Sequence, residues 1–107
     1  MNKVALLYTT WPDAETAEAV AAEAVAERLA ACVNILGSAR SIYRWQGAVE
    51  RAVETVAIFK TDASAVDRLT ALIVERHPYE TPAVVALPVN FEGSNAAYLD
   101  WLRNEIG

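Results

Sequence analysis

The stretch SIYRWQGAVERAVETVAIFKT, residues 41–61, carries the pattern that decides the fold of this chain. Gln46-Gly47 is typical of a two-residue turn, and the apolar residues before and after it predict a β-hairpin. Residues 53–59 are rich in β-branched side chains, which favours a central position in a sheet. Because the hairpin is longer than the mean strand of about 5–6 residues, we expect it to project beyond the sheet or to pair with another chain.

On the N-terminal side of the hairpin, the sequence predicts a strand, a helix and a second strand. Residues 4–8 are continuously apolar, as in a buried strand, and Asp13 is a typical helix N-cap. The helix that follows has apolar residues spaced four apart, which predict a buried stripe. Residues 32–36 then enter the hairpin, with a bend or bulge expected at Gly37-Ser38. The predicted stripe consists of Ala17, Ala21, Val25 and Leu29.

On the C-terminal side, the sequence predicts a helix, a fourth strand and a short last helix. Pro78 lacks an N–H and disfavours helical backbone at His77, so the longer helix should end there. Residues 84–89 predict a strand, in which Pro88 indicates an edge or a bulge. The expected N-caps are Ser64 (with Asp67 completing the capping pattern) and Ser94, and the expected apolar stripes are Val66, Leu69 and Ile73 in one helix and Leu99, Leu102 and Ile106 in the other.

The expected order is therefore βαββαβ with a terminal helix, in a single domain over residues 1–107. Right-handed crossovers place both long helices on one face of a four-stranded antiparallel sheet, which is the ferredoxin-like α+β architecture. Strands such as residues 53–59 are apolar on both faces, but the two helices cover only one. Because an uncovered apolar face of this size marks an interaction surface, we expect an oligomer.

The composition excludes several classes of protein. The chain is 54% hydrophobic and 21% charged, unlike a disordered chain. Its net charge is −5 and its nine basic residues are scattered, so we expect neither a nucleic acid nor an anionic membrane surface as partner. No apolar run approaches the roughly 20 residues of a membrane span. The single cysteine, Cys32, cannot form an internal disulfide, which fits the cytoplasm as the expected location.

No motif for catalysis or nucleotide binding occurs in the sequence. G-x-G-x-x-G, P-loop, C-x-x-C and H-E-x-x-H patterns are absent, and no two carboxylates stand out as an acid–base pair. Cys32 and His77 form the only combination of a thiol with an imidazole, and nothing local ties them together. We expect Cys32 to be a small buried hydrophobe, and we expect the chain not to be an enzyme.

His77 is the only histidine, and two interpretations are open for it. A cationic histidine at a helix C-terminus gains roughly 0.3–1 kcal/mol from the helix dipole and can bond the last carbonyls. Histidine is also a common metal ligand. A structural metal site requires several ligands held together, so in the second case subunits would each contribute a ligand at an interface.

The aromatic residues give a further signal. Tyr43 and Trp45 lie two apart and therefore on one face of the predicted hairpin, and Tyr79 and Trp101 come from the second half of the chain. One interpretation is that these aromatic side chains pack in the core and at contacts between subunits. The other is an aromatic-lined cleft between subunits that takes a small ligand. The cleft candidates are Tyr43, Trp45, Tyr79 and Trp101.

Taken in order, these segments resemble the CutA family of divalent-cation tolerance proteins over nearly the whole chain. The resemblance implies a ferredoxin-like fold, a tight homotrimer whose extended hairpins pair across subunits, and binding of copper or other divalent ions. The architecture also looks like that of PII-type signalling proteins, which bind nucleotides and small effectors between subunits. No established catalytic activity comes with the family. The matching segments are Pro12-Asp13, LAACVNIL (29–36), SIYRWQG (41–47), IFKT (58–61), HPYETP (77–82) and YLDWL (98–102).

The resemblance is incomplete at the metal site. Some bacterial relatives have a cysteine at the end of the first strand and a His-His pair before the PY. In this chain Tyr8 or Thr9 occupies the first place and Arg76 the second, which leaves His77 as the candidate ligand. A guanidinium is a permanent cation and does not bind metals. We expect a trimeric divalent-cation (copper) tolerance protein, and a PII-like small-molecule-binding module is the alternative.

Overall fold

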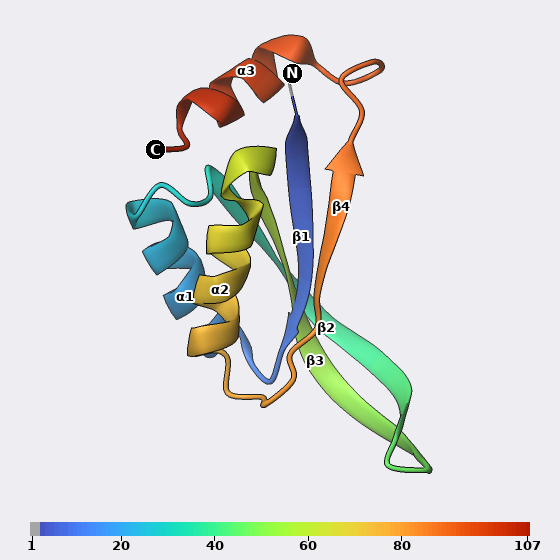
Figure 1. Ribbon diagram of the computed structural model, residues 1–107. Coiled ribbons are helices and arrows are strands. Elements are labelled where there is room, and N and C mark those ends of the chain that lie inside the picture. The colour runs from blue at the N-terminus through green and yellow to red at the C-terminus, as the bar shows by residue number, and fades with distance from the viewer. Residues whose placement is uncertain (1–2) are drawn as a thin grey trace.

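The computed structural model describes residues 3–107 and shows an antiparallel sheet with helices on one face. The elements are β1 (Val4–Trp11), α1 (Ala14–Ala26), β2 (Cys32–Trp45), β3 (Ala48–Asp62), a 3-10 turn η1 (Ala63–Ala65), α2 (Val66–Arg76), β4 (Val84–Val89) and α3 (Ala96–Asn104). The strand order is β2-β3-β1-β4, and α1 and α2 lie side by side over one face (Figure 1). The predicted α+β architecture, with βαββαβ order and a terminal helix, is confirmed. Among the described residues, no helix is both long enough and apolar enough to cross a bilayer.

The hairpin of β2 and β3 is the longest feature of the sheet and extends beyond it (Figure 1). Its turn has φ angles of 48° at Gln46 and 82° at Gly47, the left-handed conformation that glycine adopts freely. The register shifts between Leu36 and Ser38, so the predicted irregularity is a β-bulge. β3 lies between β2 and β1, as its β-branched residues predict.

Helix α1 begins as predicted, but its buried stripe differs from the prediction. The Asp13 carboxylate accepts a 2.7 Å bond from the Thr16 N–H and caps the helix. A strict spacing of four advances about 40° per step around a helix of 3.6 residues per turn, so the predicted stripe drifts off the sheet. Val25 is 41% exposed, whereas Leu29 is buried in the core but lies beyond the end of α1. The residues of α1 that are buried are Ala17, Val20, Ala21 and Ala24.

The two other predicted N-caps are also wrong by a few residues. Ser64 does not cap α2; instead its N–H and hydroxyl both donate to the Asp62 carboxylate, which starts η1 ahead of the helix. The Ser94 hydroxyl donates to the Asn90 carbonyl. Asn95 caps α3 instead, because its side-chain oxygen accepts a bond from the Ala97 N–H. Asp62 thus caps η1, whereas the N-cap of α2 is Ala65, which makes no side-chain bond; at α3, Asn95 takes the position predicted for Ser94, since asparagine caps as well as serine does.

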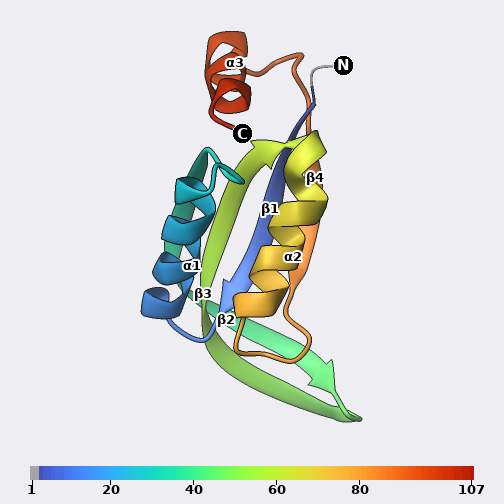
Figure 2. The same ribbon diagram turned by 60° about the vertical axis from the view of Figure 1, so that its left-hand side comes forward.

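The core lies between the sheet and the two long helices, and the opposite face of the sheet is largely open (Figure 2). Fully buried side chains include Leu7, Trp11 and Phe59 on the helix side. α3 covers only one end of the molecule, where Leu99 and Leu102 pack against Val4. On the open face, large apolar side chains of β2 and β4 stay exposed, among them Leu36 (49%), Val85 (51%) and Leu87 (44%).

Asp62 ties α3 to the end of β3, and we expect its charge to stabilise the fold. Arg103 Nε donates a 2.7 Å bond to its carboxylate. Burial alone would raise the pKa of Asp62, but Arg103 and the two bonds from Ser64 together lower it. A lowered folded pKa gives stability that is complete above the unfolded pKa and is lost as the pH falls through the folded pKa.

Asp62→Asn should therefore cost about 1–2 kcal/mol of unfolding free energy at pH 7, and the deficit should shrink below about pH 4. Urea unfolding of the wild type and the variant, at pH 7 and again below about pH 4, measures this difference in unfolding free energy. Asp100→Asn, at an exposed carboxylate of α3, is the control and should change little. A deficit that stays constant down to pH 2 would contradict a role for the charge.

Candidate functional site

His77 is the C-cap of α2 and is 7% exposed in one chain. Its backbone N–H bonds the Ile73 carbonyl at 2.8 Å, whereas its ring turns away from the helix. Nε2 lies 2.7 Å from the Thr10 carbonyl, and Nδ1 accepts a 3.1 Å bond from the Tyr79 N–H. A carbonyl accepts and an N–H donates, so these partners assign the neutral Nε2–H tautomer. The prediction that a cationic ring bonds the last helix carbonyls is therefore wrong, because the backbone N–H takes that role.

The His77 ring also packs into the core. It stacks on Trp11 with centroids 4.2 Å apart and planes inclined by 23°. Trp11 Nε1 donates to Thr9 Oγ1 at 2.6 Å, and Thr9 Oγ1 donates to the Ala57 carbonyl at 2.7 Å. Both ring nitrogens of His77 and the indole N–H of Trp11 are thus used within the chain.

The positions expected for a metal site do not come together around His77. Tyr8 and Thr9 lie on opposite faces of β1, and the Thr9 hydroxyl is buried and bonded. Cys32 starts the edge strand β2 and is partly exposed, not buried as predicted. Among residues 3–107, no group of three His, Cys, Asp or Glu side chains could hold a metal ion.

Arg76 points away from His77 and pairs with α1. Its Nε and Nη2 donate to the two carboxylate oxygens of Glu23 at 3.1 and 3.0 Å, and Nη1 lies 3.3 Å from Glu75. The bond to Arg76 lowers the pKa of Glu23, and a bond with Glu23 raises the pKa of Glu27. The two partners are 53 residues apart, so local spacing in the sequence gives no sign of the pair.

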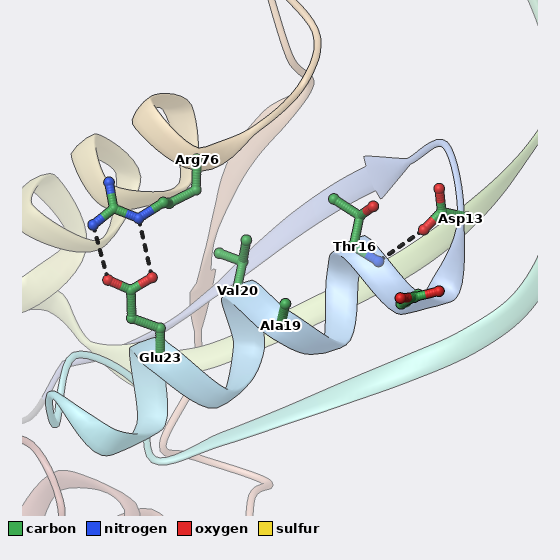
Figure 3. A pocket seen from close by; sticks show the side chains of 7 residues that line it. Asp13, Thr16, Ala19, Val20, Glu23 and Arg76 are labelled. Atoms are coloured by element: carbon green, nitrogen blue, oxygen red, sulfur yellow. Dashed lines mark hydrogen bonds and ion pairs between the residues drawn. The ribbon is translucent and has the colours of Figure 1, made fainter.

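This ion pair closes one end of a groove along α1, shown in Figure 3, with a volume of about 540 Å³. The charged groups at its two ends have partners within the chain: Glu23 binds Arg76, and Asp13 at the other end binds the Thr16 N–H. The groove is therefore explained by helix capping and helix–helix pairing. It is lined by Asp13, Glu15, Thr16, Ala19, Val20, Glu23 and Arg76.

A second hollow, of about 650 Å³, lies on the open face where the hairpin leaves the sheet; we call it the hairpin pocket. It brings together Tyr43, Trp45 and Tyr79, three of the four predicted cleft residues. Trp101 does not line it in this chain, because Trp101 belongs to α3 and packs on Tyr98 with centroids 5.5 Å apart. The other lining residues are Tyr8, Thr10, Ser41, Ile42, Glu54, Glu80, Thr81 and Ala83.

Glu54 lines the hairpin pocket, although the sequence analysis did not single it out as a site residue. Tyr79 Oη donates a 3.2 Å bond to Glu54 Oε2. Burial, the charge of Glu54 and this bond raise the pKa of Tyr79. The sequence could have indicated this position. The Gln46-Gly47 turn pairs Tyr43 with Glu50 across the hairpin, and Glu54 lies four residues further along β3 and therefore on the same face.

Known proteins of one family are similar to this chain over nearly its whole length. A sequence model described as "CutA1 divalent ion tolerance protein" matches residues 5–105. The "Divalent-cation tolerance protein CutA" of Thermus thermophilus is 46% identical over 107 residues, spanning all of both chains. The chloroplastic "Protein CutA 1" of Oryza sativa is 40% identical over 99 residues, which are 92% of this chain but 55% of the rice protein. The chain thus spans about half the length of that relative.

Solved structures give the same result. The divalent cation tolerance protein of Thermus thermophilus has a TM-score of 0.92 and 42% identity, covering 97% of this chain and 99% of the other. CutA of Xylella fastidiosa also has a TM-score of 0.92, with 38% identity and coverage of 97% and 98%. The similarity therefore includes the strand order, the helices and the sequence together.

Proposed function

The chain belongs to the CutA1 family of divalent ion tolerance proteins, and from this premise we propose that it acts as a homotrimer in tolerance of divalent cations, copper foremost. The observation that carries the proposal is the full-length match to the Thermus thermophilus protein, 46% identical over 107 residues. We also propose that residues 1–107 form one CutA-like domain that works in the cytoplasm. No catalytic step belongs to the proposal, since the sequence holds no catalytic motif.

The homotrimer is supported by the apolar side chains that one chain leaves exposed. The open face presents Leu36, Val85 and Leu87, and the hairpin carries Val49 and Val53 with exposures of 58% and 64%. The valines of the hairpin lie on the other face of the sheet from the three open-face residues, so both faces present large apolar side chains that a partner chain would cover. We propose that the open faces of three copies pack together and that the hairpins are exchanged between them, which also pairs the free backbone groups of the strand edges.

The residues of one chain do not fit a closed copper site. His77 has no free ring nitrogen, and Arg76 is committed to Glu23. If His77 is a ligand, the metal must displace the Tyr79 N–H from Nδ1 and take its other donors from neighbouring copies. The proposal is therefore a weak site for copper or another divalent cation, shared between copies, with His77 as its one imidazole.

Copper titration of the wild type and of His77→Gln, followed by calorimetry, tests this site. Glutamine keeps an N–H donor for the Thr10 carbonyl but offers no imidazole nitrogen. If His77 is a ligand, its loss should weaken copper binding about tenfold or more, as losing a ligand or its support commonly does. Equal affinity in the two proteins would remove His77 from the site, and no binding to either would reject copper as the ion.

The hairpin pocket favours a second candidate function, a PII-like module that binds a small molecule between subunits. Its volume, about 650 Å³, lies within the range of small-molecule sites. Four aromatic residues, Tyr8, Tyr43, Trp45 and Tyr79, line it, and Tyr79 is bonded to Glu54. A trimer contact would have to bring Trp101, the fourth predicted cleft residue, to the same place.

A further inference from the structure

The hairpin pocket combines two kinds of side chain, aromatic rings and carboxylates. Tyr43 and Trp45 stand on β2, Tyr79 on the loop before β4, and Glu54 on β3. Glu80 adds a second carboxylate from the same loop. Among residues 3–107, no lysine or arginine lines the pocket, so within the described part of the chain these carboxylates face no cationic side chain there.

Glu54 is held in place by its neighbours. Its carboxylate accepts the Tyr79 hydroxyl at 3.2 Å, and the Tyr79 N–H is fixed on His77 Nδ1 at 3.1 Å. The Tyr79 ring packs on the His77 ring with centroids 4.7 Å apart, and that ring is stacked on buried Trp11. One hydrogen bond satisfies only part of a carboxylate, which accepts about four. The core therefore supports a carboxylate that has acceptor capacity left toward the pocket.

The chemistry of the lining decides between classes of ligand. A nucleotide or other anion would be repelled by Glu54 and Glu80, and the lining that one chain supplies, within residues 3–107, offers it no guanidinium or ammonium. A hard metal ion is held by several carboxylate or carbonyl oxygens; the pocket offers two carboxylates, Glu54 and Glu80, and no group of three metal-ligating side chains occurs among residues 3–107. An organic ammonium ion matches both the aromatic rings and the carboxylates of the pocket. Aromatic faces attract a cation within about 6 Å, and a carboxylate neutralises its charge.

We propose that the hairpin pocket binds a small organic cation, with Tyr43, Trp45 and Tyr79 around its ammonium group and Glu54 as the counter-ion. This inference rests on the second proposed function, that the hairpin pocket is a ligand site. It adds the chemical class of the ligand. The net charge of −5 attracts such a ligand at longer range.

Choline and its neutral carbon isostere, 3,3-dimethylbutan-1-ol, form a matched pair of probes, since they differ in charge but hardly in shape. Binding is followed by NMR of the three indole N–H groups, which belong to Trp11, Trp45 and Trp101. Only Trp45 lines the pocket. We expect choline to shift the Trp45 signal saturably, to leave the other two in place, and to bind at least tenfold more tightly than the isostere.

Glu54→Gln tests the counter-ion, because glutamine keeps an acceptor for the Tyr79 hydroxyl and removes the charge. We expect it to weaken choline binding at least tenfold and to leave the isostere unchanged. Glu18→Gln removes the same charge from an exposed position on α1 and should leave both affinities unchanged. Equal weakening by Glu18→Gln would mean that net charge alone attracts choline, which would overturn the assignment of Glu54.

A third probe, the anion benzoate, separates failure of the cationic ligand class from failure of the hairpin pocket as a ligand site. Equal affinity for choline and the isostere, or a Trp45 shift caused by benzoate alone, would overturn the cationic class and keep the hairpin pocket as a ligand site. A Trp45 signal that none of the three probes moves would overturn the pocket itself, without bearing on the trimer or on copper.

Discussion

A chain carrying both Leu36→Asp and Leu87→Asp should be a monomer in solution, whereas the unchanged chain should have the mass of three. Both side chains lie on the open face, half exposed in one chain, so the change costs the isolated fold little. In the proposed trimer each would be buried. Burial of a leucine contributes about 1.5–3 kcal/mol, and six positions change per trimer, so the loss is on the order of 10 kcal/mol per trimer. Light scattering measures the mass directly.

The matched control for this prediction is Val25→Asp with Val74→Asp. These valines are 41% and 45% exposed, close to the two leucines, but they lie on the outer sides of α1 and α2. The control adds the same charge and should remain trimeric. A monomeric wild type would reject the trimer, and a trimeric Leu36/Leu87 variant would place the interface on the hairpin instead of the open face.

The parts of the fold that the sequence predicts are those that depend on local chemistry. Gln46-Gly47 needs left-handed backbone, so the turn and the register around it follow from two residues. Asp13 caps α1 through a residue three positions away. The predicted N-cap at Ser94 was wrong because the neighbouring Asn95 caps equally well. The predicted N-cap at Ser64 was wrong because Asp62 starts a 3-10 turn ahead of α2, and α2 then begins after Ala65 without a side-chain cap.

The candidate site depends on contacts between distant segments, which is why sequence reasoning found only part of it. The Thr10 carbonyl that engages the His77 ring is 67 residues away, and Glu54 is 25 residues from Tyr79. Residue type suggested that His77 was a ligand or a helix end. Only the tertiary structure shows that it joins α2, β1 and the loop before β4.

His77→Ala should lower the free energy of unfolding by roughly 3–5 kcal/mol per chain. The ring is 7% exposed, and its removal leaves a cavity beside Trp11 and two backbone groups without partners, the Thr10 carbonyl and the Tyr79 N–H. Both bonds are partly buried, so each group left without a partner costs toward the lower end of about 1–3 kcal/mol, and the cavity beside Trp11 adds to that. Urea unfolding at one fixed protein concentration measures the loss, because oligomer stability depends on concentration.

His77→Gln and His77→Asn separate the two hydrogen bonds in this loss. Glutamine can keep a donor for the Thr10 carbonyl and asparagine an acceptor for the Tyr79 N–H, so each should lose less than alanine does. A side chain kept only to bind a metal would behave as a surface residue does, within about 0.5 kcal/mol on substitution. If His77→Ala unfolds like the wild type in metal-free buffer, the structural role is wrong and ligation becomes the better explanation of this histidine. A loss of the expected size without metal means instead that His77 supports Tyr79, and through it Glu54, before any ligand is bound.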